Sequence, residues 1–223
     1  MKIELIPVIE ITYYNELNPP DKGPYWEFPK EWNEYTKLRL KKAGFNSTMN
    51  SYNPGSSFFE ATKIPKDNLE KLISDWFKDY NGKNIDEILP FYGGYVMKLN
   101  NDNIYFPQCC GDLGDIIYWE QLIKEKKNVY YNGHPSPIIS FSNSEVKFEF
   151  NEDEEEFCPP TPQEIIVEIN LLEKAFEQTL SVLKQFERNI LKTNKHLEYK
   201  LTAEEFVNIL IYRNQELENK ASA

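Results

Sequence analysis

The sequence predicts an α+β fold, in which a mixed or antiparallel sheet built from hairpins is covered by helices and followed by a C-terminal helical hairpin. Two pairs of apolar runs, joined by short Asn-containing turns near residues 100–103 and 143–144, indicate the hairpins. Apolar residues at spacings of three and four in residues 66–80 and 163–192 indicate the helices.

The N-terminal part contains one predicted strand and one predicted short helix. Residues 2–14 are rich in β-branched and aromatic side chains, which favours a strand, and Pro7 favours an edge position or a bulge within it. Residues 30–43 form the predicted helix, because Gly44 follows a last turn that contains two lysines.

The middle of the chain contains both predicted hairpins. The first joins residues 91–99 to 104–106, and the second joins residues 137–141 to 145–150. Between them we expect a helix that begins at Asp112, because an aspartate directly before a periodic apolar run is a favoured N-cap.

A change in composition after the second hairpin predicts a division of the chain. Five consecutive acidic residues are followed by three prolines within a few positions, which is typical of a linker. The predicted division is an α+β domain over residues 1–151, an acidic, Pro-rich linker over 152–162 and a C-terminal helical extension over 163–223. The extension packs on the first domain or on a second copy of the chain, which would make a homodimer.

Two helices are expected in the extension. The first covers residues 163–192. The second covers residues 203–217 and begins after Thr202, where Glu205 completes the pattern of a capping box.

Charge and length limit the classes of function. The chain has 223 residues and a formal net charge of -11, and it has no cluster of basic residues, so we expect no nucleic-acid partner. An acidic surface attracts a basic protein partner and speeds its encounter. The alternative interpretation is that the acidity only promotes solubility.

The expected location is the cytoplasm. Three cysteines are too few, and odd in number, for a disulfide scaffold, so a reducing compartment fits best. The first residues lack the uninterrupted apolar core of a signal peptide, and no run is long enough to span a membrane.

A proline-rich loop over residues 15–29 is one candidate binding surface. It contains three aromatic residues, Tyr25, Trp26 and Phe28. They could form an exposed recognition surface, since Trp and Tyr concentrate in interface hot spots, or they could anchor a long loop to the core.

The adjacent cysteines Cys109 and Cys110 are the candidate for chemistry. They directly precede a predicted helix N-terminus, where the helix dipole lowers the pKa of a thiol, and His134 is one of two histidines that could serve as a base. The alternative is that a cysteine packs inward while Gly111 permits a tight turn. Adjacent cysteines fit zinc poorly, and we expect no metal and no cofactor.

Residues 105–119, Tyr-Phe-Pro-Gln-Cys-Cys-Gly-Asp-Leu-Gly-Asp-Ile-Ile-Tyr-Trp, resemble a group of uncharacterised bacterial proteins that share a proline, paired cysteines, a glycine and a following Trp. The order of helix, Gly-Gly and short hairpins over residues 60–150 is similar to the SUKH immunity superfamily of polymorphic toxin systems. This resemblance implies an antitoxin-like binding protein whose basic partner is a toxin, and it implies no active site.

Taken with the charge, these patterns predict a non-enzymatic protein-binding module. The alternative is a cysteine-dependent enzyme that uses Cys109 or Cys110 with His134. The predicted binding residues are Tyr25, Trp26, Phe28, Cys109, Cys110 and Asp112.

Overall fold

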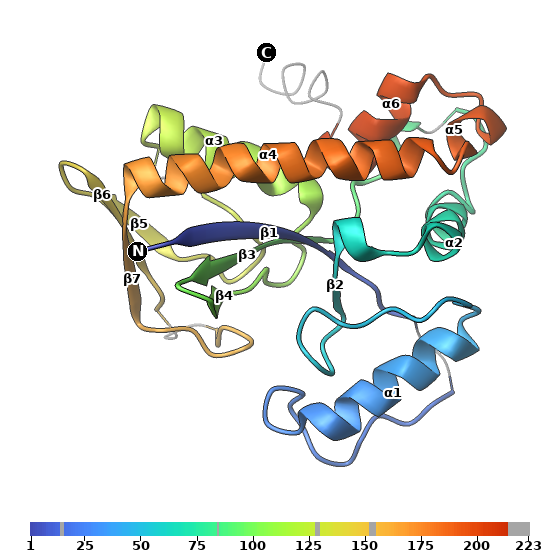
Figure 1. Ribbon diagram of the computed structural model, residues 1–223, viewed down its shortest axis with the longest axis horizontal. Coiled ribbons are helices and arrows are strands. Elements are labelled where there is room, and N and C mark those ends of the chain that lie inside the picture. The colour runs from blue at the N-terminus through green and yellow to red at the C-terminus, as the bar shows by residue number, and fades with distance from the viewer. Residues whose placement is uncertain (14–15, 84, 128–129, 152–154, 214–223) are drawn as a thin grey trace.

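The computed structural model describes residues 1–13, 16–83, 85–127, 130–151 and 155–213 of the chain. In these ranges two antiparallel sheets, one of four strands and one of three, are covered by helices, so the predicted α+β fold is confirmed (Figure 1). Within the same ranges, no helix is both long and apolar enough to cross a membrane.

The larger sheet has the strand order β2-β1-β3-β4. Its strands are β1 (Ile3–Glu10), β2 (Phe58–Glu60), β3 (Gly93–Leu99) and β4 (Asp102–Tyr105). β3 and β4 form the first predicted hairpin, and its turn places Asn100 and Asn101 at positive φ, which asparagine tolerates better than most residues. The strand expected over residues 2–14 is confirmed in the shorter span of β1, and residue 14 lies outside the described residues.

Pro7 lies within β1, which is an interior strand of its sheet. The N–H of Ile11 donates to Ser57 on the β2 side, and the N–H of Glu10 donates to Tyr92 on the β3 side. Because these directions alternate along a strand, the nitrogen of Pro7 faces the β2 side, where pairing with β2 extends only from Val8 to Glu10. β1 is therefore locally an edge at Pro7, and no ladder hydrogen bond is lost there.

The smaller sheet has the order β5-β6-β7. β5 (Ile138–Phe141) and β6 (Glu145–Glu149) form the second predicted hairpin. The helix predicted over residues 163–192 begins later than expected, at Ile169. The prediction is wrong for residues 164–168, which form the strand β7 (Glu164–Glu168) and pair with β6. Its side chains alternate, with Ile165 and Val167 buried and Ile166 45% exposed, and its β-branched residues suit the free edge of β6.

The long helix α4 (Ile169–Leu191) follows β7 directly and runs along β1 (Figure 1). Its buried side chains belong to one hydrophobic cluster together with residues of β1, β3 and β6. The chain on both sides of the predicted linker therefore shares one sheet and one core. Within that linker, residues 152–154 lie outside the described residues.

The remaining helices are short. They are α1 (Pro29–Lys42), α2 (Lys66–Trp76), α3 (Ile116–Glu120), α5 (Lys195–Glu198) and α6 (Ala203–Val207). α1 confirms the helix predicted over residues 30–43, and α2 confirms the start of the helix predicted over residues 66–80 but ends at Trp76. α6 begins with the predicted capping box of Thr202 and Glu205 and continues as a π-helical turn, Asn208–Tyr212, while residues 214–217 of the predicted helix lie outside the described ones.

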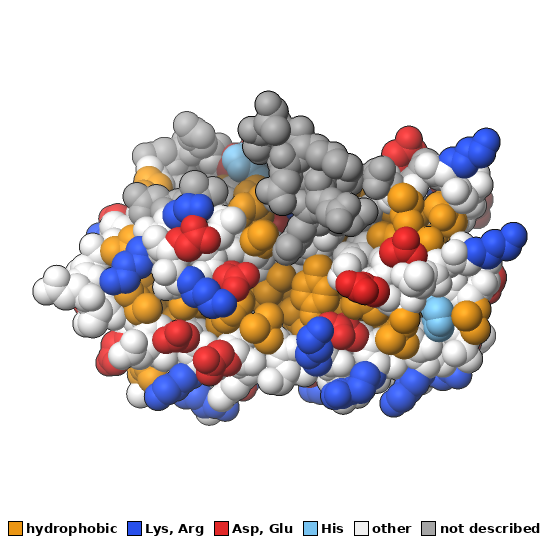
Figure 2. All heavy atoms as spheres, turned by 90° about the horizontal axis from the view of Figure 1, so that it is seen from above, with side chains coloured by type: hydrophobic (Ala, Val, Ile, Leu, Met, Phe, Trp, Pro, Cys, Tyr) orange, Lys and Arg blue, Asp and Glu red, His pale blue; other side chains and the backbone are white. Residues whose placement is uncertain are grey.

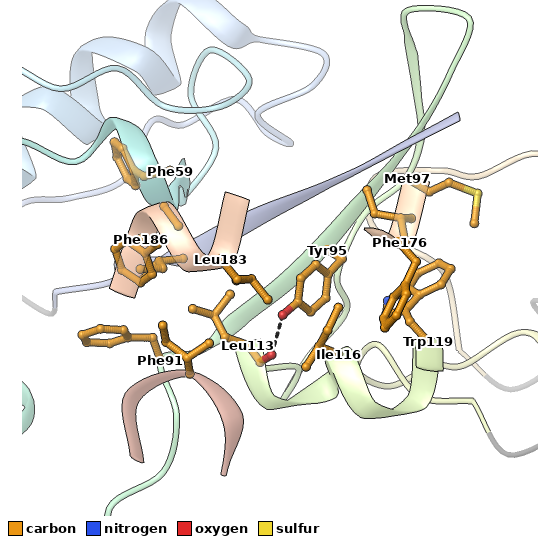
Figure 3. Packing of buried hydrophobic residues seen from close by; sticks show 14 of the residues in the cluster. Phe59, Phe91, Tyr95, Met97, Leu113, Ile116, Trp119, Phe176, Leu183 and Phe186 are labelled. Carbon is orange, nitrogen blue, oxygen red and sulfur yellow. Dashed lines mark hydrogen bonds between the residues drawn. The ribbon is translucent and has the colours of Figure 1, made fainter. Parts of the chain in front are cut away.

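Aromatic side chains fill the space between the first sheet and its helices (Figure 3). Tyr95 of β3 is fully buried, and its hydroxyl donates to the carbonyl of Leu113 at 2.5 Å. The preceding Gly93 has a φ of +135°, and a Cβ there would lie 2.1 Å from the carbonyl oxygen of Val8. Gly93 therefore lets β3 approach β1 closely, whereas a Cβ at Gly94 would lie 2.7 Å from Oδ1 of Asn132.

Candidate functional site

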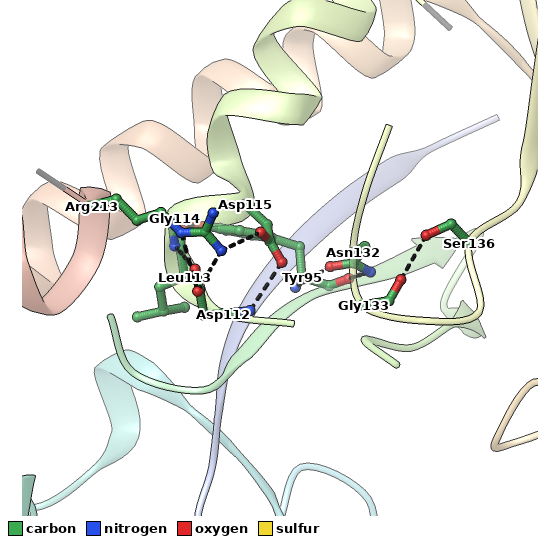
Figure 4. A network of polar contacts seen from close by, with 9 residues as sticks. All are labelled: Tyr95, Asp112, Leu113, Gly114, Asp115, Asn132, Gly133, Ser136 and Arg213. Carbon is green, nitrogen blue, oxygen red and sulfur yellow. Dashed lines mark hydrogen bonds and ion pairs between the residues drawn. The ribbon is translucent and has the colours of Figure 1, made fainter. Parts of the chain in front are cut away.

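The turn that carries Cys109 and Cys110 is fixed by the backbone on both sides. The N–H of Gln108 donates to the carbonyl of Asn132 at 2.8 Å, and the N–H of His134 donates to the carbonyl of Cys109 at 2.8 Å. The side-chain amide of Asn132 in turn accepts from the N–H of Tyr95 and donates to its carbonyl (Figure 4). The cysteine turn is thus tied through Asn132 to the centre of β3.

The two thiols lie side by side on the surface. Their sulfur atoms are 3.2 Å apart, and both residues are exposed. Cys110 has a φ of +65°. The expected tight turn at Gly111 is confirmed, since a Cβ at Gly111 would lie 2.7 Å from the carbonyl oxygen of Gly93. The alternative prediction, in which a cysteine packs inward, is therefore wrong for Cys109 and Cys110, because both are exposed.

The environment of Cys109 disfavours its thiolate. The pKa of Cys109 is raised, first by its hydrogen bond with Cys110, then by burial, and then by the negative charges of Cys110, Glu10 and Glu155. The following helix begins with a three-residue 3-10 turn, Leu113–Asp115, so its dipole is weak. The predicted lowering of this thiol pKa is therefore wrong.

His134 lies next to Cys109 through the backbone, but its imidazole is directed to a carboxylate. Its Nε2 lies 3.2 Å from Oε2 of Glu155 on the neighbouring loop, and 63% of its side chain is exposed. Among the described residues, no hydrogen bond joins this imidazole to either sulfur. The structure thus places His134 beside Cys109 through the backbone, but the imidazole forms no hydrogen bond to the thiol, which a general base needs.

Tyr25, Trp26 and Phe28 are all partly buried. Tyr25 packs edge-on against Trp26 with a centroid distance of 5.1 Å, and its hydroxyl is buried without a hydrogen-bond partner among the described residues. The pKa of Tyr25 is raised by burial first and then by the charges of Cys158 and Glu10. The negative charge of Glu10, at the C-terminal end of β1, contributes to the raised pKa of both Tyr25 and Cys109.

Asp112, two residues after Cys110, is buried in the interior. Its side chain accepts the N–H of Gly114 at 2.7 Å, so its predicted role as a cap is confirmed. Its second oxygen accepts two N–H groups of Arg213, at 2.7 and 3.3 Å (Figure 4). With a side chain only 4% exposed, Asp112 holds the end of the described chain and offers no surface for a partner.

Asp115 shares the same arginine and is fully buried. Burial, and then the charge of Asp112, raise the pKa of Asp115 to about 7, although Arg213 acts in the opposite direction. Arg213 follows Asp112 by 101 positions, and nothing in the local pattern of either segment predicts their contact.

An open groove between the end of α2 and the chain before β3 was not predicted from the sequence. It has a volume of about 520 Å³, and Trp76, Leu89 and Tyr92 are among its lining residues. The Trp76 ring packs edge-on against Tyr92 at 5.1 Å, while its Nε1–H donates to the carbonyl of Leu89 at 2.8 Å. Leu89 and Tyr92 are 48% and 43% exposed, so apolar surface is open to solvent here.

Three carboxylates and one ammonium group line the same groove: Asp75, Asp79, Glu87 and Lys78. The carboxylate of Asp75 already accepts from Lys71 and Tyr13. The side chain of Asp79 is 88% exposed, and its carboxylate lies 4.0 Å from the ammonium group of Lys78, which is itself 73% exposed. The sequence pattern placed Trp76 on the buried face of its helix. The sequence did contain one sign that Trp76 would be partly exposed. It lies close to Asp75, Asp79 and the Asn81-Gly82 turn, and polar residues and a turn at a helix end indicate that the helix leaves the core there.

The outer face along α4 differs from this groove. Acidic and basic side chains are interspersed over it (Figure 2), and Lys184 and Glu187 of α4 form an ion pair at 2.7 Å.

In the described part of the chain, no group of three or more His, Cys, Asp or Glu side chains is arranged to hold a metal ion. Comparisons of the chain with known protein families, curated proteins and solved structures found no match.

Proposed function

We propose that the protein is a non-enzymatic binding module for a basic protein partner. The observation that carries the proposal is the groove at Trp76 and Tyr92, where exposed apolar surface lies beside the exposed carboxylate of Asp79. Aromatic rings in such positions supply most of the energy of many protein interfaces. The net charge of -11 adds long-range attraction for a positively charged partner.

The occupant of the groove is a Lys- or Arg-bearing segment of that partner. A cationic side chain can lie over the face of Tyr92 or Trp76 and pair with Asp79, while its neighbouring apolar residues cover Leu89. An acidic segment would meet Asp79 and Glu87 with like charge, which disfavours it. The half-buried rings of Tyr25, Trp26 and Phe28 form a second candidate contact surface.

The competing candidate, a cysteine-dependent enzyme, has weaker support. A nucleophilic cysteine needs a lowered thiol pKa or an adjacent base, whereas the pKa of Cys109 is raised and His134 faces Glu155. If the enzyme hypothesis holds, Cys109 should react with iodoacetamide faster than an unhindered model thiol at neutral pH. Slow modification of both cysteines favours the binding module.

The resemblance to immunity proteins makes the proposal more specific. In that form, the chain acts in the bacterial cytoplasm and neutralises a basic toxin. Growth assays test it: a captured native partner should arrest growth when expressed alone, and co-expression of the chain should restore growth. A homodimer through the C-terminal helices remains part of the proposal, although the apolar face of α4 is already buried in the chain's own core.

A peptide array tests the groove directly. The probes are synthetic peptides in which Lys or Arg alternates with apolar residues, each paired with a copy in which Glu replaces the basic residues. We expect the full chain to bind the basic set only. Tyr92→Ala should weaken the binding by about thirtyfold, because loss of a hot-spot ring typically costs about 2 kcal/mol.

Charge-reversal variants distinguish an ion pair formed at the groove from the attraction exerted by the net charge of the whole protein. Asp79→Lys and Glu173→Lys change the net charge equally, but Glu173 is an exposed residue of α4, on the mixed-charge face. The proposal requires the Asp79 variant to lose much more affinity than the Glu173 variant. Equal losses would mean that only the overall charge matters, and unchanged binding in Tyr92→Ala would remove the groove as the site. If Trp26→Ala alone abolishes binding, the proline-rich loop is the contact surface instead.

A further inference from the structure

We infer that Cys109 and Cys110 form a reversible two-thiol site, which small-molecule disulfides such as glutathione disulfide oxidise to a disulfide between the two adjacent residues. This inference is independent of the groove. It rests on the position of the two sulfur atoms, on the fixed backbone around them and on their exposure.

The two side chains point to the same side of the chain. In an extended strand successive side chains point to opposite faces, and adjacent thiols would diverge. The left-handed conformation of Cys110, with a φ of +65°, removes this alternation and brings the sulfur atoms to 3.2 Å. A disulfide requires about 2.05 Å, so the two sulfur atoms are within about 1.2 Å of bonding distance.

The surrounding contacts keep the pair in this arrangement. Hydrogen bonds from Gln108 to Asn132 and from His134 to Cys109 fix the backbone before and at the first cysteine. Beyond the second, the N–H of Gly111 donates to the carbonyl of Gln108 at 3.2 Å, and the N–H of Gly93 donates to Gly111 at 2.9 Å. The thiols are thus held together before any oxidation, which raises the effective concentration of one at the other.

The reaction is a two-step thiol–disulfide exchange. The thiolate of one cysteine attacks a sulfur of the small disulfide, breaks its S–S bond and releases one small thiolate. The neighbouring cysteine then attacks the protein sulfur of the mixed disulfide, closes the S–S bond and releases the second small thiolate. Two electrons pass to the small disulfide, and the two cysteine protons end on the released thiols.

The product is strained and therefore easily reduced. The Cys109–Cys110 peptide bond is trans, which fixes the two Cα atoms about 3.8 Å apart. Disulfides prefer Cα separations of roughly 4.4 to 6.8 Å, and strained, exposed disulfides are the labile ones. The raised pKa of Cys109 slows attack by its own sulfur, but Cys110 is also exposed and can make the first attack instead.

Cys158 is the competing thiol. Its backbone N–H donates to the side chain of Gln108 at 2.9 Å, and the side-chain amide of Gln108 donates to its carbonyl at 3.3 Å. It therefore lies on a loop adjoining the pair. Cys158→Ser is the matched control, because it removes one exposed thiol near the site while both partners of the proposed bond remain.

Mass spectrometry of the full-length protein tests the inference. After equilibration with mixtures of reduced and oxidised glutathione, remaining thiols are blocked and the protein is digested with trypsin. Residues 99–124 then form one peptide that contains both cysteines of the pair and excludes Cys158. We expect this peptide to lose two hydrogen atoms and carry no adduct, equally in wild type and Cys158→Ser. Cys109→Ser should instead carry one glutathione on Cys110.

A trivalent arsenical supplies a second readout. Phenylarsine oxide forms two As–S bonds with a thiol pair and releases its oxygen as water. Wild type and Cys158→Ser should bind one equivalent tightly, whereas Cys109→Ser, Cys110→Ser and the oxidised protein should lose that binding. Separate glutathione adducts on the two cysteines, a bond from either one to Cys158, or tight arsenical binding by a single-serine variant would each overturn the inference. Unchanged melting of the reduced variants shows that they fold.

Discussion

The hydroxyl of Thr179 on α4 lies 2.7 Å from the carbonyl oxygen of Leu5 on β1, a residue 174 positions earlier. The same hydroxyl lies 2.8 Å from the carbonyl of Ala175, one turn back in its own helix. The carbonyl of Leu5 faces the β2 side of the sheet, beyond the end of the pairing with β2. A side chain of α4 thus takes the place of a missing strand partner, in a position that is closed to water.

Thr179→Val should destabilise the protein by about 1–3 kcal/mol, because it leaves a buried carbonyl unpaired with almost no change in volume. Urea unfolding measures the difference. Thr36→Val is the matched control, since Thr36 is equally buried but its hydroxyl lies 3.3 Å from the carbonyl of Gly55. A loss at Thr179 no larger than that at Thr36 would mean that the Leu5 carbonyl is satisfied in another way.

Asp115 should make stability depend on pH. Its pKa is about 7 in the folded protein and 3.8 in an unfolded chain, so the folded state binds more protons between these values. This contribution is complete below about pH 4 and is lost as the pH rises through 7. Asp115→Asn keeps an acceptor for the N–H of Asp112 but cannot ionise. The difference in unfolding free energy between wild type and this variant should therefore fall, by up to a few kcal/mol, from pH 4 to pH 7. A difference that is constant with pH contradicts the raised pKa.

Two glycine substitutions should separate backbone strain from steric overlap. Gly93 and Gly82 both have positive φ, but a Cβ at Gly93 overlaps the carbonyl of Val8, whereas a Cβ at Gly82 meets no atom within 4 Å. Gly82→Ala should cost about 1–2 kcal/mol, the penalty of a left-handed alanine. Gly93→Ala should cost more than about 3 kcal/mol or prevent folding, since β1 and β3 cannot separate without breaking their pairing. Thermal melting compares the two, and similar losses would show that β3 can shift.

A chain that ends at residue 151 should fail to fold cooperatively. It lacks β7, which pairs with β6, and α4, whose side chains fill the core beside β1. We expect a broad thermal transition and binding of a hydrophobic dye, in contrast to the full chain. A sharp unfolding transition in the short chain would instead establish residues 1–151 as an independent domain.

Local patterns were sufficient for most secondary structure. Asn100 and Asn101 marked the first hairpin turn, Thr202 and Glu205 marked a helix start, and Asp112 marked another. These signals are local because each depends on a few consecutive backbone groups. The run over residues 164–168 was misread because its apolar positions fit both a helical and an alternating period, and only the open edge of β6 decides between them.

The candidate sites depend on contacts that no local pattern contains. The charges of Cys158 and Glu10 act on Tyr25 only because the fold brings distant segments together. The same holds for the hydrogen bond that Arg213 donates to Asp112. The sequence predicted the turn at Gly111 but not that both Cys109 and Cys110 would be exposed. It could not reveal that His134 faces Glu155, or that the end of α2 leaves Trp76 beside exposed Tyr92.

The contact between Thr179 and Leu5 also affects how the chain folds during synthesis. β1 is synthesised early, whereas its partner strand β3 follows about 90 residues later. Thr179 of α4 follows Leu5 by 174 residues. At about 5–20 residues per second, the ribosome needs roughly 10 to 35 s to reach Thr179. During that time α4 is absent from the apolar face of β1 and the carbonyl of Leu5 lacks its partner on Thr179, so the core closes only after α4 has been made.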